Sequence, residues 1–205
     1  MRGLLKLSDG IDWVVGWIGR LTMWLVLAAV LISAGNAIIR KTFNVSSNAY
    51  LEVQWYLFAA VFMLGAAYVF LHNGHVRIDF IAARLSKRTN AIIDSIGIVV
   101  FLVPLCLILI DLSWPFFVRA YQSGEMSENA GGLIRWPAIL LIPAGFGILL
   151  VQAFSELIKR VAFITGARTE PFRFGHEKTA EEELVEELAN ARAIDGVVSP
   201  QQAPK

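Results

Sequence analysis

The sequence predicts an all-α integral membrane protein with four transmembrane helices, both termini in the cytoplasm, and additional amphipathic helices in the membrane interface. The first observation is a set of four long apolar stretches, near residues 21–39, 51–71, 91–118 and 136–157. In three of them, 19 or 20 consecutive residues carry no charge. About 20 helical residues cross the hydrocarbon core of a bilayer, and a segment in lipid must satisfy its own backbone hydrogen bonds. Each stretch therefore predicts a membrane-spanning helix.

The second observation is the distribution of basic residues between these stretches. Up to residue 173, eleven fall on the side of the two termini and the second loop: Arg2, Lys6, Arg20, Arg77, Arg84, Lys87, Arg88, Lys159, Arg160, Arg168 and Arg173. Four fall on the other side: Arg40, Lys41, Arg119 and Arg135. Because the richer side of a membrane protein faces the cytoplasm, the bias predicts cytoplasmic termini, as an even number of crossings also requires.

Composition agrees with this fold class and excludes several functions. The 205 residues are 56% hydrophobic, more than an ordinary soluble domain carries. A net charge of +1 argues against a nucleic-acid partner. Cys106 is the single cysteine and lies in the third stretch, so an intramolecular disulfide is excluded and the thiol is interpreted as a small packing residue.

The first element is predicted as an interfacial amphipathic helix over residues 1–20. Apolar residues such as Leu4, Leu7 and Ile11 recur at spacings of three and four, and Trp13 and Trp17 suit the headgroup level. An alternative is that these residues only extend the first spanning helix. The domain that follows, 21–165, is predicted as a bundle of four transmembrane helices.

Within the bundle, the second helix begins with Glu52 at the outer boundary, where a charged carboxylate should face water or a cationic partner because its burial is costly. A basic stretch after His72 predicts a second interfacial helix ending near Arg88. Pro104 at the centre of the third helix predicts a kink or a free carbonyl.

Beyond the bundle, residues 166–205 are predicted as an acidic, largely disordered cytoplasmic tail with six glutamates between 177 and 187.

Candidate chemistry is sparse. His72 and His75, with Asp79 nearby, have ligand types that metals accept, and they support an alternative in which the chain anchors a redox or metal-dependent membrane enzyme. Asn73-Gly74 between the histidines disfavours the regular helix that would align them, so a polar interfacial cluster is the preferred interpretation. Haem ligation is disfavoured because the spanning stretches hold no histidine. We expect no enzyme activity, no metal and no cofactor.

Several short motifs, taken in order, resemble one transporter family. They are Glu52-Val53-Gln54-Trp55, then Gly65-Ala66-Ala67, then His75-Val76-Arg77-Ile78-Asp79. Their order and spacing resemble the small, DctQ-like membrane subunit of tripartite ATP-independent periplasmic (TRAP) transporters over roughly residues 10–165. The long acidic tail departs from the short ending usual in that family.

The resemblance implies a non-catalytic small permease subunit in a bacterial inner membrane. Its partners would be a large multispanning subunit, which holds sodium and substrate, and a periplasmic binding protein that delivers an organic acid. The resemblance implies subunit packing or anchoring for the residues that match its motifs: Glu52, Trp55, Gly65, His75, Arg77 and Asp79. Charged residues in the predicted periplasmic loops, 40–50 and 119–135, are hypothetical contacts for the binding protein: Arg40, Lys41, Arg119, Glu125, Glu128 and Arg135. Ordinary solvated loop charge is the alternative interpretation of that last set.

Overall fold

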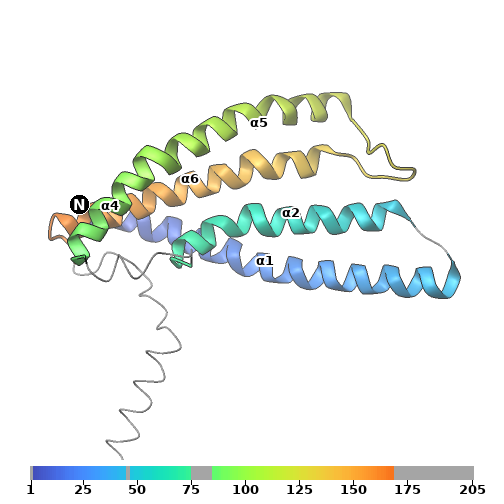
Figure 1. Cartoon of the computed structure of the whole chain (residues 1–205), viewed down its shortest axis with the longest axis horizontal. Coiled ribbons are helices and arrows are strands. Elements are labelled where there is room, and N and C mark those ends of the chain that lie inside the picture. The colour runs from blue at the N-terminus through green and yellow to red at the C-terminus, as the bar shows by residue number, and fades with distance from the viewer. Residues whose placement is uncertain (1, 45–46, 75–84, 169–205) are drawn as a thin grey trace, which may run out of the picture. The chain divides into compact units, whose positions relative to one another are not determined.

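The computed structural model describes residues 2–44, 47–74 and 85–168, and helices account for most of them. The helices are α1 (Arg2–Phe43), α2 (Asn48–Leu71), α4 (Lys87–Gly97), α5 (Val103–Ser123) and α6 (Trp136–Ile164). A π-helical turn, η1 (Ile98–Leu102), joins α4 to α5, so that Lys87–Ser123 is one helical rod. Figure 1 shows the resulting four rods. All four are long and apolar enough to cross a membrane, which confirms the predicted all-α class and the number of spanning helices.

Helix α1 differs from the prediction at its N-terminal part. The helix is continuous over 42 residues, with no break between the predicted elements 1–20 and 21–39. No proline interrupts it, and Gly19 is used for packing, because a Cβ there would lie 2.0 Å from the ring of Tyr68 on α2. A helix of this length measures about 63 Å, roughly twice the hydrocarbon thickness. The interfacial position of residues 1–20 stays a prediction.

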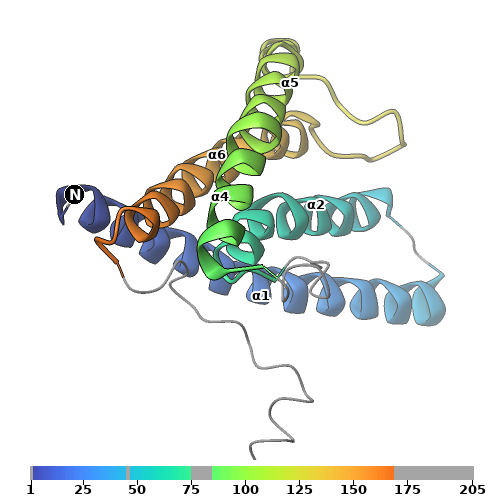
Figure 2. The ribbon, with the colours of Figure 1, turned by 60° about the vertical axis from the view of Figure 1, so that its left-hand side comes forward.

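Helix α6 occupies the centre of the described bundle. It contacts α1, α2, α4 and α5, while α1 pairs mainly with α2. Figures 1 and 2 show from two directions that α6 lies between α5 and the α1–α2 pair. The end of α1, the beginning of α2 and the connection 124–135 lie at one end, here called the hairpin end. The beginning of α1 and the end of α6 lie at the other, here called the terminus end. Alternating helix directions therefore bring the two described chain ends to one side, as four crossings require.

The irregular turn in the third rod lies directly before its proline. The N–H of Val103 donates to the carbonyl of Ile98, five residues back, and Pro104 follows. Proline has no N–H for the preceding turn and crowds its carbonyls, and a single π-helical turn is a common way to accommodate such a defect. The predicted disturbance at Pro104 is thus found in the turn N-terminal to it.

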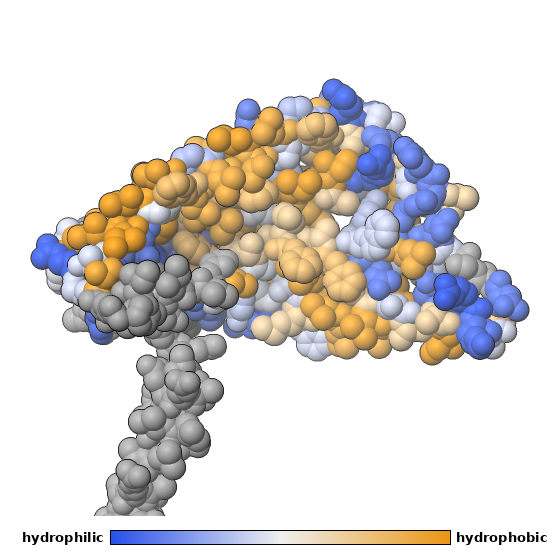
Figure 3. Space-filling view, in the orientation of Figure 1, coloured by the Kyte–Doolittle hydropathy of each residue, from blue (hydrophilic) through white to orange (hydrophobic). Residues whose placement is uncertain are grey.

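Little of the chain is buried, and its outer surface is apolar. One small core cluster contains Val15 of α1 with Ala67 and Leu71 of α2, packed against Tyr68 and Ile148. Large side chains elsewhere point outwards, including Trp24, Phe62 and Phe101 at 68%, 73% and 72% exposure. Figure 3 shows hydrophobic atoms over the middle of the helices and hydrophilic atoms gathered at the hairpin end. A surface of this kind fits lipid or another membrane protein.

Candidate functional site

A buried carboxylate fastens the 124–135 connection to α2 at the hairpin end. Glu52 is only 5% exposed. Its Oε1 accepts hydrogen bonds from the Ser127 hydroxyl and from Asn129 Nδ2, the latter at 2.8 Å, and its Oε2 accepts from the Leu133 N–H at 2.6 Å. The sequence predicted that the Glu52 carboxylate would face water or a cationic partner. In the structure its oxygens instead accept hydrogen bonds from neutral groups, with the Arg135 guanidinium near enough to attract the carboxylate. Three donors of the connection replace its hydration, which makes the burial tolerable.

Two further side chains of α2 hold the same connection. Asn48 Nδ2 donates to the carbonyl of Ala130 at 3.0 Å, and the Tyr56 hydroxyl donates to the carbonyl of Ile134 at 3.1 Å. Together with Glu52 they lie at i, i+4 and i+8 on one face of α2, a spacing visible in the sequence. Within the connection, Met126 and Ile134 form a bridge between antiparallel segments. The hairpin end is therefore ordered by α2 and not by its own turns alone.

A second buried polar cluster joins three helices at the terminus end. Lys159 of α6 is fully buried and donates to Oδ2 of Asp12 on α1 at 3.0 Å and also to Glu156. Arg160 donates from Nη1 to Oε2 of Glu156 at 2.6 Å, and its Nε lies 3.5 Å from Oδ2 of Asp94 on α4. The ionic cluster, defined as these five residues, ties α1 and α4 to α6.

Neutral side chains complete the contacts of Asp12. Its Oδ1 accepts from the Ser155 hydroxyl at 2.7 Å and from Gln152 Nε2 at 3.1 Å. The hydroxyls of Ser8 and Ser155 are also 2.7 Å apart. On α6 the participating side chains fall at 152, 155, 156, 159 and 160, which is one helical face. Because each buried charge has a close partner and further hydrogen bonds, the desolvation cost of the cluster is compensated.

The sequence analysis missed this cluster. Lys159 and Arg160 were placed beyond the last helix, among the cytoplasmic charges, but α6 continues to Ile164 and buries both. The polar residues of α6 recur at spacings of three and four, so their common helical face could have been recognised in the sequence. Its partner Asp12 lies 147 residues from Lys159, and nothing local connects the two.

Neither cluster has the parts of a reaction centre. The hairpin cluster pairs one carboxylate with amide and hydroxyl donors, and the ionic cluster pairs carboxylates with cations, so both are suited to holding elements together. Among the described residues no group of three or more histidine, cysteine, aspartate or glutamate side chains could hold a metal ion. His72 lies against Tyr68, with ring centroids 4.1 Å apart and Nδ1 3.0 Å from the Tyr68 carbonyl. His75 and Asp79 lie outside the described residues.

Comparison with known families gives one match. The model of the family described as "Tripartite ATP-independent periplasmic transporters, DctQ component" matches residues 29–163, about two thirds of the chain. The chain belongs to the DctQ family. The resemblance read from the motifs of α2 and the loop after it is thus confirmed. Searches of curated proteins and of solved structures found no match.

The residues that match the family motifs have different environments in this DctQ-family chain. Glu52 is buried and holds the 124–135 connection, as described above. Trp55 is 68% exposed on the next turn of α2. Gly65 is partly exposed, and a Cβ at its position would meet no described atom within 4 Å. His75, Arg77 and Asp79 lie outside the described residues.

An outward-facing apolar stripe runs along α2 through two of these positions. Leu51, Trp55, Phe58, Phe62 and Val69 are 38–73% exposed. With Gly65 they fall at spacings of three and four, which places them on one face of the helix. Aromatic side chains beside a small residue are typical of a surface that packs closely against another helix. This stripe is the best candidate for an interface in the membrane.

The six predicted binding-protein contacts all lie toward the hairpin end, although their elements differ from the prediction. Arg40 and Lys41 lie in the last turn of α1, and Arg119 lies in α5, so none of the three belongs to a loop. All six are exposed. Arg135 and Glu125 form an exposed ion pair. The basic pair at the end of α1 complements the negative pole of that helix.

A polar hollow lies beside Glu52 at the same end. It has a volume of about 510 Å³ and is lined by α2, α6 and the connection. Trp55 and Tyr56 form part of its apolar wall, while Glu128 and Arg135 place opposite charges at it. Two of the six predicted contact residues, Glu128 and Arg135, therefore border this hollow, and Glu52 holds in place the connection that forms one side of it.

Proposed function

We propose that this chain is the non-catalytic small permease subunit of a sodium-coupled TRAP transporter that imports an organic acid across the bacterial inner membrane. The main observation is the family match over residues 29–163, which includes the last third of α1 and nearly all of the rest of the bundle. The arrangement of the bundle supports the proposal, because its buried polar groups tie the helices together and its apolar residues face outwards. Sodium and substrate are assigned to the large membrane subunit.

In this proposal the large subunit packs against the stripe on α2. The stripe is long, apolar and without a partner among the described residues, and Gly65 permits close approach of a second backbone. The binding protein docks at the hairpin end, where exposed charge surrounds the polar hollow. Both termini lie in the cytoplasm, as the distribution of basic residues predicts.

The first experiment measures uptake and complex formation together. Cells lacking this chain should lose sodium-dependent uptake of the organic acid, and the tagged wild-type chain should restore uptake and purify with the large subunit. Phe62→Ala on α2 should weaken co-purification. Phe101→Ala in η1 should not, although both rings are more than 70% exposed. Uptake that persists without the chain would refute the scaffold role, and loss of co-purification with the Phe101 variant alone would refute the α2 interface.

Docking is tested in the same cells by reversing charges at opposite ends of the bundle. Arg40→Glu with Lys41→Glu changes the hairpin end, and Lys87→Glu with Arg88→Glu changes an equally basic exposed pair at the beginning of α4. The first variant should raise the concentration of binding protein needed for half-maximal uptake, and this effect should diminish at high salt because exposed charges are screened. Equal effects of the two variants would contradict docking at the hairpin end.

A further inference from the structure

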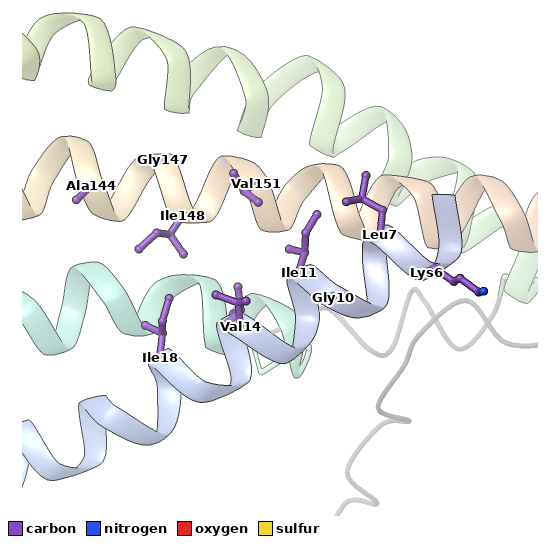
Figure 4. A pocket seen from close by; sticks show the side chains of 11 residues that line it. Lys6, Leu7, Gly10, Ile11, Val14, Ile18, Ala144, Gly147, Ile148 and Val151 are labelled. Carbon is purple, nitrogen blue, oxygen red and sulfur yellow. The ribbon is translucent and has the colours of Figure 1, made fainter. Parts of the chain in front are cut away.

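An apolar groove opens between the N-terminal half of α1 and the middle of α6. Its volume is about 650 Å³. Leu7, Ile11, Val14 and Ile18 line one wall, and Ile148 and Val151 lie on the other. Figure 4 shows these side chains facing the space between the two helices, with Lys6 at the end nearest the chain terminus. The groove is separate from the stripe on α2 and from the polar hollow at the hairpin end.

Two glycines keep the groove open. Gly10 of α1 and Gly147 of α6 both line it, and a Cβ at either position would meet no atom within 4 Å. By contrast, Gly145, two residues before Gly147, is packed tightly against Met63. The groove is thus an open space between two helices that are clamped nearby by the ionic cluster.

The length and lining of the groove accommodate a hydrocarbon chain. From Lys6 to Ile18 the groove extends roughly 18 Å along α1. Its lining is apolar except for Lys6 at one end. An extended acyl chain can therefore lie along the groove, with its carbon atoms about 3.5–4.0 Å from the walls.

The charge at the groove complements a lipid headgroup. Lys6 contributes its aliphatic stem to the lining and directs its ammonium past the end of the groove (Figure 4). Lys6 is exposed, and no ion pair of Lys6 is found within the described residues. Lysine side chains at membrane surfaces commonly place the stem in apolar surroundings and the charge at the level of the phosphates.

We propose that this groove binds one anionic phospholipid. An acyl chain lies between α1 and α6, and the phosphate contacts the ammonium of Lys6. An anionic headgroup is preferred to a zwitterionic one because it brings no second cation beside Lys6. The inference requires only that the chain spans a membrane, and it holds whether or not the transporter role is correct.

The test measures lipid retained by the purified full-length chain. The chain is reconstituted in vesicles of phosphatidylcholine with phosphatidylglycerol, extracted in mild detergent, and its bound lipids are counted by native mass spectrometry. The wild type should retain one lipid with preference for phosphatidylglycerol. Gly147→Leu fills the groove and should abolish retention, while Gly16→Leu, at an open position outside the groove, should not.

A second variant separates the headgroup from the acyl chain and leaves packing unchanged. Lys6→Gln should still retain a lipid but lose about fivefold in preference for phosphatidylglycerol, whereas Lys41→Gln at the hairpin end should behave as the wild type. Equal lipid retention by Gly147→Leu and Gly16→Leu would overturn the proposal. So would Val14→Cys forming a cross-link to a protein chain in native membranes, because a protein helix would then occupy the groove.

Discussion

At the scale of single residues, the buried charges of this chain act on its own helices. Lys159 is among the least exposed side chains of the described bundle, although lysine is rarely buried without a partner. Its ammonium lies between two carboxylates on different helices. Glu52 follows the same principle with neutral donors, since three groups of the 124–135 connection converge on its carboxylate. Both residues hold segments in place that are distant in the sequence.

Replacing Lys159 should therefore destabilise the bundle strongly. Lys159→Met keeps most of the side-chain volume but leaves Asp12 buried without its cation and removes one of the two cations that contact Glu156. Loss of one partner of a buried pair costs about 3–5 kcal/mol in the free energy of unfolding. Thermal unfolding of the purified chain, followed by circular dichroism, should show the loss. Lys87→Met, at an exposed position, is the matched control and should change stability by less than about 0.5 kcal/mol.

A double variant distinguishes lost charge from lost packing. Asp12→Asn with Lys159→Met removes the stranded carboxylate on α1, so it should recover part of the stability that Lys159→Met loses. If the single variant melts like the Lys87→Met control, the ionic cluster does not hold the helices together.

At the scale of the element, α6 carries most of the tertiary organisation. Its polar face meets α1 and α4 at the terminus end, and its small residues meet α2 nearer the middle. Gly145 is the closest of these contacts, because a Cβ there would lie 2.7 Å from the Cβ and 2.8 Å from the carbonyl oxygen of Met63. Such backbone proximity is the ordinary role of small residues between membrane helices.

Two neighbouring glycines of α6 should respond oppositely to the same substitution. Gly145→Ala forces α2 and α6 apart and should cost about 1–3 kcal/mol of stability, as overpacking does. Gly147→Ala extends into the open groove and should be neutral or stabilising by up to about 1 kcal/mol, because alanine favours the helix. Thermal unfolding of both variants under one set of conditions measures the difference. Equal melting temperatures would contradict the close α2–α6 contact.

At the scale of the whole molecule, the alternating helices determine which segments share a side of the membrane. The beginning of α2 and the 124–135 connection lie together at the hairpin end, and the described chain ends lie together at the other end. The fold alone does not say which end faces the cytoplasm. The distribution of basic residues selects the orientation, and it still does so after Lys159 and Arg160 are removed from the count, since nine basic residues remain against four.

The orientation can be tested with single introduced cysteines. Cys106 is buried, so background labelling in intact cells should be low. Glu128→Cys at the hairpin end should react with a membrane-impermeant maleimide added outside cells whose outer membrane has been permeabilised. Ala167→Cys, just beyond α6 and equally exposed, should react only after the inner membrane is disrupted. The reverse pattern would contradict the cytoplasmic position of the termini.

The sequence was most informative where local composition decides structure. The four rods follow from apolar length alone, because a chain in lipid must form its hydrogen bonds within each segment. The beginnings of α2 and α6 fall within three residues of the expected positions, near Glu52 and at Trp136. The observed helix boundaries differ from the expected ones at the end of α6 and within α1. In α6, buried ion pairs allow the helix to continue through charged residues beyond its expected end. In α1, no proline interrupts the helix at the expected boundary near residue 20.

By itself, the sequence determined the membrane class, the four spanning helices and the family, because hydropathy, charge and short motifs are local properties of the chain. Only the tertiary structure decided what the buried polar residues do. Glu52 meets donors 75 to 81 residues away, and Asp12 meets Lys159 across 147 residues. No local pattern specifies such pairs, since they exist only after the helices have packed. The physical reason is that an unpaired charge buried in an apolar bundle is costly in free energy. Buried charges are therefore paired, even when the two partners are far apart in the sequence.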